Sequence, residues 1–115
     1  ILVEKYGIEN VLRQYKSDVY PFQCDFYVVS KDLYIECNFH WTHNGHLYNK
    51  NSIKDIITKC KWNIKAKKSK FYTNALKTWT WRDVKKYNIA KNNNLKYLIF
   101  YNIKDFENYY INKDN

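Results

Sequence analysis

Two acidic residues at a spacing that suits metal chemistry lie close together in the first third of the chain. Asp25 and Glu36 fall in segments that otherwise resemble apolar strands. A carboxylate on a buried strand is costly unless it is paired or binds a metal. If the two segments form a hairpin, both carboxylates lie near its open end, where their oxygens suit Mg²⁺ or another divalent cation. The alternative is that Asp25 ends its strand in solvent and Glu36 faces water opposite a lysine.

Three histidines, His40, His43 and His46, follow directly after the second acidic segment. An imidazole can accept or donate a proton near neutral pH, so His43 is a candidate general base or acid. Asp83, at the start of a predicted helix, is a candidate to orient it. The alternatives are an ordinary loop histidine at position 43 and a helix-capping residue behind Thr80 at position 83.

A zinc site is a second interpretation of the same stretch. Cys37, His40, His43 and His46 recur every three residues, and both residue types bind zinc. The run lacks the paired ligands of common zinc knuckles, so a structural-zinc interaction domain is kept as an alternative. The chain has three cysteines, an odd number without disulfide spacing, which indicates reduced thiols and a cytoplasmic compartment.

The composition indicates a folded, strongly basic domain. With 45% apolar and 19% aromatic residues, the chain can build a core. Lys and Arg outnumber Asp and Glu by 20 to 11, a formal charge of +9 over 115 residues. Such an excess suggests an anionic partner, first nucleic acid and then a membrane surface, although the codon bias of an AT-rich genome is an alternative cause. No apolar run approaches the ~18 residues of a membrane span, so none is predicted.

The segment from 59 to 70 concentrates the positive charge. Six lysines occur there with no acid between them, and tryptophan, tyrosine and phenylalanine residues lie nearby. Lysine attracts phosphate, and aromatic rings stack on bases or insert between them, so this segment is a candidate nucleic-acid surface. The alternative is a solvated helix face whose aromatic residues belong to the core.

The elements that must position these residues follow from periodicity and turn residues. Ser30-Lys31-Asp32 joins two β-rich runs as a hairpin. A helix beginning at Ser52 is indicated by apolar residues spaced i, i+3, i+4, i+7 and i+11, namely Ile53, Ile56, Ile57, Cys60 and Ile64. Thr80-x-x-Asp83 matches the start signal of a further helix that ends near Asn92.

The remaining elements complete an α/β order. We predict a helix end over residues 1–10 with Gly7 as its C-cap, strands over 11–16, 24–29 and 33–39, a turn over 17–21, a loop over 42–49, a strand buried on both faces over 95–101, and a short terminal helix or frayed end from 105. The predicted order α-β-β-β-α-α-β-α gives a mixed sheet flanked by helices, in one domain that spans residues 1–115.

The Asp25-x10-Glu36-x-Asn38 pattern on a hairpin resembles the core of the PD-(D/E)xK nucleases. The chain departs from that motif because Cys24 replaces its Pro and Asn38 replaces its Lys. It is more similar to one branch, the very-short-patch mismatch repair endonucleases and the related phage-type EDxHD homing endonucleases, where a His and a further Asp carry the acid-base role. The stretches CDFYVVSKDLYIECNFHWTH and WRDVKKYNIAKNNNLKYLIFYN carry this resemblance, which covers residues 9–103.

The resemblance implies a restriction-endonuclease-like fold and a role for each matched residue. Asp25 falls on the metal-binding Asp, His43 on the catalytic His, and Asp83 on the Asp that pairs with this His. Glu36 is the expected second metal carboxylate, and the four side chains are expected to converge in one pocket. Asn38 and His46 are expected as secondary site residues.

The first acid of the EDxHD pattern is a Glu in an N-terminal helix. Glu4 and Glu9 are the candidates within this sequence. The chain begins without methionine and is expected to be part of a longer protein, so this Glu is alternatively expected upstream of Ile1.

The expected function is therefore a Mg²⁺-dependent DNA endonuclease, the catalytic domain of a homing or mobile-element enzyme acting on double-stranded DNA in the cytoplasm of its host. The alternatives are a catalytically inactive DNA-binding module of a larger protein and a structural-zinc interaction domain. Backbone phosphate contacts are expected from Lys61, Lys65, Lys67, Lys68, Lys70, Arg82, Lys85 and Lys86.

Overall fold

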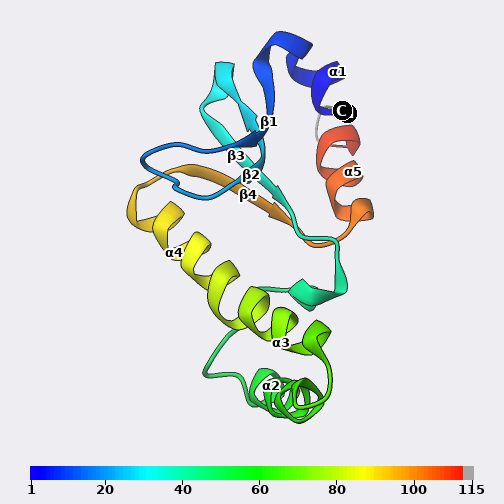
Figure 1. The fold of residues 1–115 in the computed structure, drawn as a ribbon. Coiled ribbons are helices and arrows are strands. Elements are labelled where there is room, and N and C mark those ends of the chain that lie inside the picture. The colour runs from blue at the N-terminus through cyan, green and yellow to red at the C-terminus, as the bar shows by residue number, and fades with distance from the viewer. Residues whose placement is uncertain (113–115) are drawn as a thin grey trace. The chain divides into compact units, whose positions relative to one another are not determined.

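The computed structural model describes residues 1–112, which form two compact units (Figure 1). The sheet unit comprises residues 1–39 and 88–112, and the helical unit comprises residues 40–87. The chain passes between the units after Phe39 and again after Tyr87.

The sheet unit contains the predicted strands in a mixed sheet. Its strand order is β1-β2-β3-β4; β1 pairs with β2 and β2 with β3 in antiparallel fashion, whereas β3 and β4 are parallel. A parallel pair needs a crossover connection, and this one contains the whole helical unit. The mixed α/β class is thereby confirmed. The strands are β1 (Val11–Tyr15), β2 (Cys24–Val28), β3 (Leu33–Cys37) and β4 (Lys96–Phe100).

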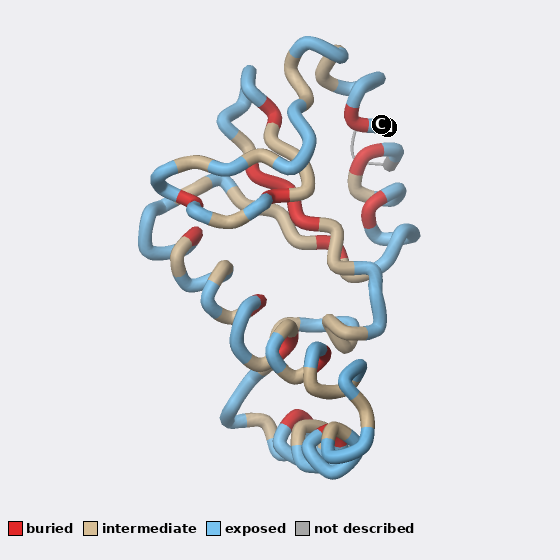
Figure 2. Tube along the Cα trace, viewed as in Figure 1, coloured by how far each residue is buried: buried red, intermediate tan, exposed pale blue. Residues whose placement is uncertain are grey.

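Apolar clusters cover both faces of this sheet. On one face, helices α1 (Leu2–Tyr6) and α5 (Ile103–Asn112) pack through Leu2, Phe106 and Tyr110 onto Val28 and Ile35. The second cluster joins Tyr20, Cys24 and Tyr34 to Ala90. Figure 2 shows buried positions on β2 and β3 and on α5. These two strands carry the candidate metal carboxylates.

The hairpin between β2 and β3 is confirmed, and its turn has a local cause. A short 3-10 turn over Val29–Lys31 ends at Asp32, which adopts φ 49°. Aspartate tolerates this left-handed conformation better than most residues because its short side chain forms local hydrogen bonds. Here the Tyr27 hydroxyl donates to Asp32 Oδ1 at 2.6 Å.

The prediction that the last strand is buried on both faces is wrong. β4 lies at an edge of the sheet, and its residues from Lys96 to Ile99 are exposed or only partly buried. β4 pairs with β3 in parallel, and both faces of β4 contact apolar clusters. Tyr97 contacts the cluster on one face, and Leu98 and Phe100 contact the cluster on the other, which explains the continuous apolar run.

The helical unit begins its first long helix where the sequence predicts. α2 spans Ile53–Ala66, and the Ser52 hydroxyl accepts a hydrogen bond from the Asp55 N–H at 3.3 Å. Such a cap satisfies one of the backbone donors that a helix start leaves without a partner.

The predicted helix start at Thr80 is wrong. α3 (Lys70–Leu76), a π-helical stretch η4 (Lys77–Arg82) and α4 (Asp83–Asn92) follow one another without a break. Thr80 therefore lies inside a helix, where its hydroxyl donates to the Leu76 carbonyl at 2.7 Å instead of capping. The predicted end at Asn92 is confirmed.

Trp79 forms the centre of the helical unit. It is fully buried, and its ring lies against Trp62 and Tyr48 at centroid distances of 5.1 and 4.9 Å. Its indole N–H donates to the His46 carbonyl at 2.9 Å. One side chain thus joins the long helical segment to the loop that carries the histidines.

We expect Trp79→Ala to lower the free energy of unfolding by about 3–5 kcal/mol, because it leaves a cavity and removes the hydrogen bond to the loop. Urea unfolding followed by circular dichroism measures this change. Trp81→Ala is the matched control; Trp81 is 59% exposed, and its loss should change stability by about 0.5 kcal/mol or less. Equal effects of the two substitutions would contradict the assignment of Trp79 to the core.

Candidate active site

Asp25 and Glu36 are joined through the backbone of the β2–β3 hairpin. The Asp25 N–H donates to Glu36 Oε1 at 3.0 Å, and the Cys37 N–H donates to Asp25 Oδ2 at 2.7 Å. Asp25 and Glu36 follow the Phe26↔Ile35 pair, the last backbone pair of the two strands at this end. Beyond it, backbone N–H groups donate to the two carboxylates and not to carbonyls of the neighbouring strand. The hairpin therefore places the two acids next to each other in the sheet unit.

Glu36 lies deeper than Asp25. Glu36 is only 2% exposed, whereas Asp25 is partly exposed. The Tyr20 hydroxyl donates to Glu36 Oε2 at 2.7 Å and lies at the same distance from the Tyr97 hydroxyl. Burial, followed by the charges of Tyr97 and Glu36, raises the pKa of Tyr20 far above its ordinary value. Tyr20 is therefore a neutral hydroxyl that can donate to the buried carboxylate.

Two cysteine thiols lie beside these acids on the same strands. Burial, and after it the charge of Glu36, raises the pKa of Cys24 to about 12. Burial, followed by the charge of Asp25, raises the pKa of Cys37 to about 12. Both groups are neutral thiols at physiological pH, so the carboxylates supply the negative charge of this cluster.

This donor set fits a hard divalent cation. Mg²⁺ is commonly held by one or two carboxylates and keeps several waters. Asp25 is the more accessible of the two carboxylates, and its Oδ2 accepts from the Cys37 N–H. Glu36 accepts hydrogen bonds from the Asp25 N–H and the Tyr20 hydroxyl, which fix the orientation of its carboxylate.

His43 and Asp83 are in contact within the helical unit. His43 Nδ1 lies 2.6 Å from Asp83 Oδ2, and the two side chains are 19% and 4% exposed. An ionised carboxylate only accepts hydrogen bonds, so this contact requires a proton on Nδ1 as the donor. His43 is thus a loop histidine bonded to Asp83, and Asp83 is not a helix cap, since it continues the helix from Arg82.

A tight turn sets the position of His43. The 3-10 turn η3 (Trp41–His43) is capped by His40, whose ring nitrogen accepts from the Thr42 N–H. Asn44 and Gly45 then adopt φ values of 52° and 71°. A left-handed pair of this kind reverses the chain, and Gly45 adopts it without the steric cost of a Cβ.

A second histidine–aspartate pair closes the same loop. His46 Nε2 lies 2.7 Å from Asp55 Oδ1, and Asp55 Oδ2 accepts from the Asn49 N–H at 2.9 Å. Asp55 is 2% exposed and the His46 side chain is 51% exposed. Together with the Trp79 hydrogen bond to the His46 carbonyl, this pair attaches the loop to two helices. His46 is thus built into the support of the loop that carries His43.

The zinc interpretation gains no support from these contacts. His43 and His46 bind different aspartates, and His40 Nδ1 lies 3.0 Å from the Thr42 hydroxyl. Between residues 1 and 112, no three His, Cys, Asp or Glu side chains are arranged so that they could hold a metal ion. That observation concerns groups of three or more side chains, so it does not bear on a magnesium site with two carboxylates.

The predicted phosphate-contacting residues all belong to the helical unit. All are exposed except Lys86, which is partly buried. Lys65 lies 5.0 Å from the centre of the Tyr72 ring, and Lys85 lies 5.1 Å from that of Trp81. Aromatic neighbours of this kind hold a lysine through a cation–π contact while its ammonium group stays in solvent.

The other predicted positions lie in the sheet unit. Asn38 is partly buried and extends β3 towards β4, since its N–H donates to the Phe100 carbonyl at 2.7 Å. Glu4 and Glu9, the candidates for the N-terminal acid, are both exposed.

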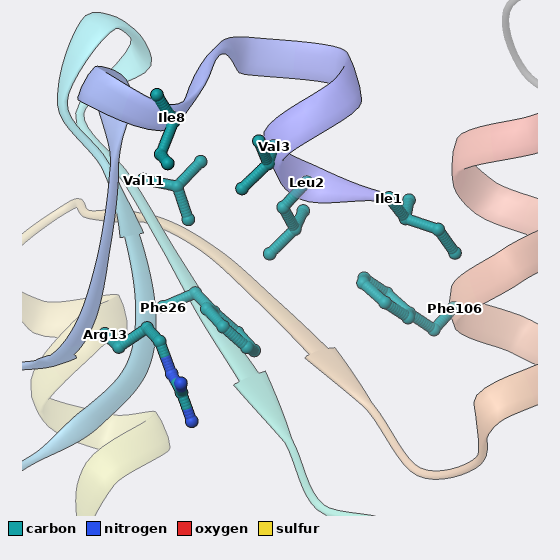
Figure 3. A pocket seen from close by; sticks show the side chains of 8 residues that line it. All are labelled: Ile1, Leu2, Val3, Ile8, Val11, Arg13, Phe26 and Phe106. Carbon is teal, nitrogen blue, oxygen red and sulfur yellow. The ribbon is translucent and has the colours of Figure 1, made fainter.

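An apolar cavity of about 390 Å³ opens between α1, the first two strands and α5 (Figure 3). Leu2, Val11, Phe26 and Phe106 are among its lining residues, and Arg13 is the charged one. None of the predicted catalytic or metal-binding residues lines it, so it is separate from the candidate site.

Sequence reasoning missed three supporting residues: Tyr20 beside Glu36 in the sheet unit, and Asp55 and Trp79 beside the histidine loop in the helical unit. Tyr20 and Trp79 carry no local signal, because their roles depend on partners far away in the chain. Asp55 does carry a local signal, because Ser52-x-x-Asp55 matches the same helix-start pattern as Thr80-x-x-Asp83.

No helix within residues 1–112 has the combined length and apolarity required to cross a bilayer. Among known proteins, no family model, no curated protein and no solved structure matches the chain.

Proposed function

We propose that the protein is a metal-dependent DNA endonuclease with a restriction-endonuclease-like fold. The observation that carries the proposal is the 2.6 Å contact between His43 and Asp83, which are forty positions apart in the sequence. The resemblance to EDxHD nucleases assigns the acid-base role to these same two residues. Asp25 falls on the metal-binding position of that resemblance, and Glu36, its neighbour on the hairpin, is proposed as the second metal carboxylate.

In this proposal His43 acts as the general base. Its Nδ1 is held by Asp83, so Nε2 is free to take a proton from water as the water oxygen attacks phosphorus. The phosphorus–O3′ bond breaks, O3′ takes a proton from solvent, and the products carry a 5′-phosphate and a 3′-hydroxyl. Asp83 stabilises the imidazolium that forms and stays hydrogen-bonded to His43 Nδ1 throughout.

Asp25 and Glu36 would hold the divalent cation, which when bound offsets the negative charge of the scissile phosphodiester. Around it, the hairpin's own groups fix the ligands. The Cys37 N–H orients Asp25, while the Asp25 N–H and the Tyr20 hydroxyl orient Glu36. Hydrogen bonds of this kind hold metal ligands in place before the metal binds.

The exposed basic residues of the helical unit supply the attraction for double-stranded DNA. Their contacts are with backbone phosphates, so binding should weaken steeply as salt increases. The exposed lysines between 61 and 70, together with exposed Arg82 and Lys85 and partly buried Lys86, are proposed for this role.

Metal removal tests the proposed function. We expect the protein to convert supercoiled plasmid into nicked or linear DNA with Mg²⁺, and to lose this activity in EDTA, because the phosphodiester charge is then not offset. Agarose gels measure cleavage, and anisotropy of a labelled duplex measures binding. Salt-sensitive binding without cleavage at any divalent ion would favour the inactive DNA-binding module, and cleavage that persists in EDTA would contradict the metal role.

A further inference from the structure

The apolar stripe of α2 faces away from the core of its own unit. The five residues that predict this helix are all exposed, with Ile53 76%, Ile57 50% and Ile64 66% exposed. The helix instead packs through Asp55 and Trp62, which bind His46 and contact Trp79. α2 therefore buries one face inside the unit and leaves its more apolar face open.

The exposed stripe has the spacing of a helix-pairing seam. Ile53, Ile57, Cys60 and Ile64 are separated by 4, 3 and 4 residues, which is the alternation of d and a positions in a heptad. Asp55 and Trp62 then both fall at f, the position opposite the seam. The buried and the open faces of α2 are thus on opposite sides of one helix, as a helix packed between two neighbours requires.

The charges beside the seam indicate what kind of helix it fits. Lys54 and Lys61 occupy the two e positions and are exposed. The one acidic residue of α2, Asp55, is buried and paired with His46. Residues at e and g select a partner by charge, so a partner helix should present acidic residues there.

A second copy of the chain lacks this complementarity. An antiparallel pair would place the lysines at e opposite the same lysines, and a parallel pair would place them opposite Ile56 and Asn63. The formal charge of +9 on each chain adds to the repulsion. DNA is also a poor match for this face, because its phosphates can pair with the lysines but cannot cover the isoleucines.

We propose that the open face of α2 is a docking site for an amphipathic helix of a partner protein, with an aliphatic seam flanked by glutamate or aspartate. The isoleucines of α2 pack against the partner's seam, and Lys54 and Lys61 pair with its acids. This interaction lies on the helical unit and shares Lys61 with the residues proposed to contact DNA phosphates.

A synthetic helix tests the proposal. The probe is a fluorescein-labelled peptide of about three heptads with leucine at a and d and glutamate at e and g. We expect the full chain to bind it in an anisotropy titration, and to bind a peptide with lysine in place of glutamate at least about tenfold more weakly. Ile57→Lys and Ile64→Lys should each weaken binding by about tenfold or more, whereas Ile103→Lys, at a residue of similar exposure (53%) on α5, should not.

Several results would overturn the proposal. One is no binding of the acidic peptide, or equal binding of both peptides. A lower thermal midpoint for Ile57→Lys than for Ile103→Lys would show that the chain itself covers the stripe. A dimer in sedimentation that Ile57→Lys dissociates, or binding to anionic phosphatidylserine vesicles that it abolishes, would assign the face to a second copy or to a membrane.

Discussion

His43→Ala is expected to reduce the rate of plasmid cleavage by about 10²–10⁴-fold, the range that a positioned general base contributes. His43 Nδ1 is bound to Asp83, so alanine removes the basic Nε2 that takes the proton from the attacking water. DNA binding should change little, because the phosphate contacts come from the lysines. Single-turnover cleavage at saturating protein separates the chemical step from binding.

A matched histidine and a chemical rescue distinguish this role from a structural one. His40→Asn removes an exposed imidazole of the same turn but keeps a side-chain acceptor for the Thr42 N–H, so it should leave the rate within about threefold of wild type. Free imidazole should restore part of the activity to His43→Ala but none to Asp83→Asn, since the latter retains its imidazole. Full activity of His43→Ala, with the protein folded, would refute the proposed acid-base centre.

Asp25→Asn is expected to lower the cleavage rate by about 10²–10³-fold, because a bound cation contributes several kcal/mol and about 1.4 kcal/mol corresponds to tenfold. Asparagine keeps an oxygen that can accept from the Cys37 N–H, so the hairpin is preserved while the charge is lost. Mg²⁺ binding, followed by calorimetry, should weaken together with cleavage.

Asp32→Asn is the control for this substitution. Asp32 is an exposed acid of the same hairpin, and its contact is with the Tyr27 hydroxyl. It should leave Mg²⁺ binding and the rate unchanged. If Asp25 and His43 serve one chemical step, the double variant Asp25→Asn/His43→Ala should reduce the cleavage rate far less than the product of the two single fold-reductions. Unchanged Mg²⁺ affinity in Asp25→Asn would reject this residue as a ligand.

Two copies of one sequence pattern show how far local reasoning reaches. Ser52-x-x-Asp55 and Thr80-x-x-Asp83 both match a helix start. Ser52 does begin a helix, because its segment follows a loop and the serine hydroxyl accepts from the Asp55 N–H at the helix start. The second lies in a helix that is already formed, so the Thr80 hydroxyl bonds back to Leu76. The pattern states a preference, and the preceding chain decides whether a helix end exists to be capped.

Local sequence patterns do not identify the partners of these two aspartates. Asp83 binds His43 and Asp55 binds His46, across forty and nine positions. Trp79 of η4 binds the same loop through the His46 carbonyl. A family resemblance predicted the first pair, whereas nothing local in the sequence indicated the second.

The sequence by itself determined the order of helices and strands and the placement of Asp25 and Glu36 on one hairpin. These follow from the period of apolar residues and from turn chemistry, which act over a few positions. The tertiary structure alone decided that α2 buries Asp55 and Trp62 while its isoleucines stay exposed. Periodicity locates an apolar face, but only the packing of distant residues determines which face of a helix the core covers.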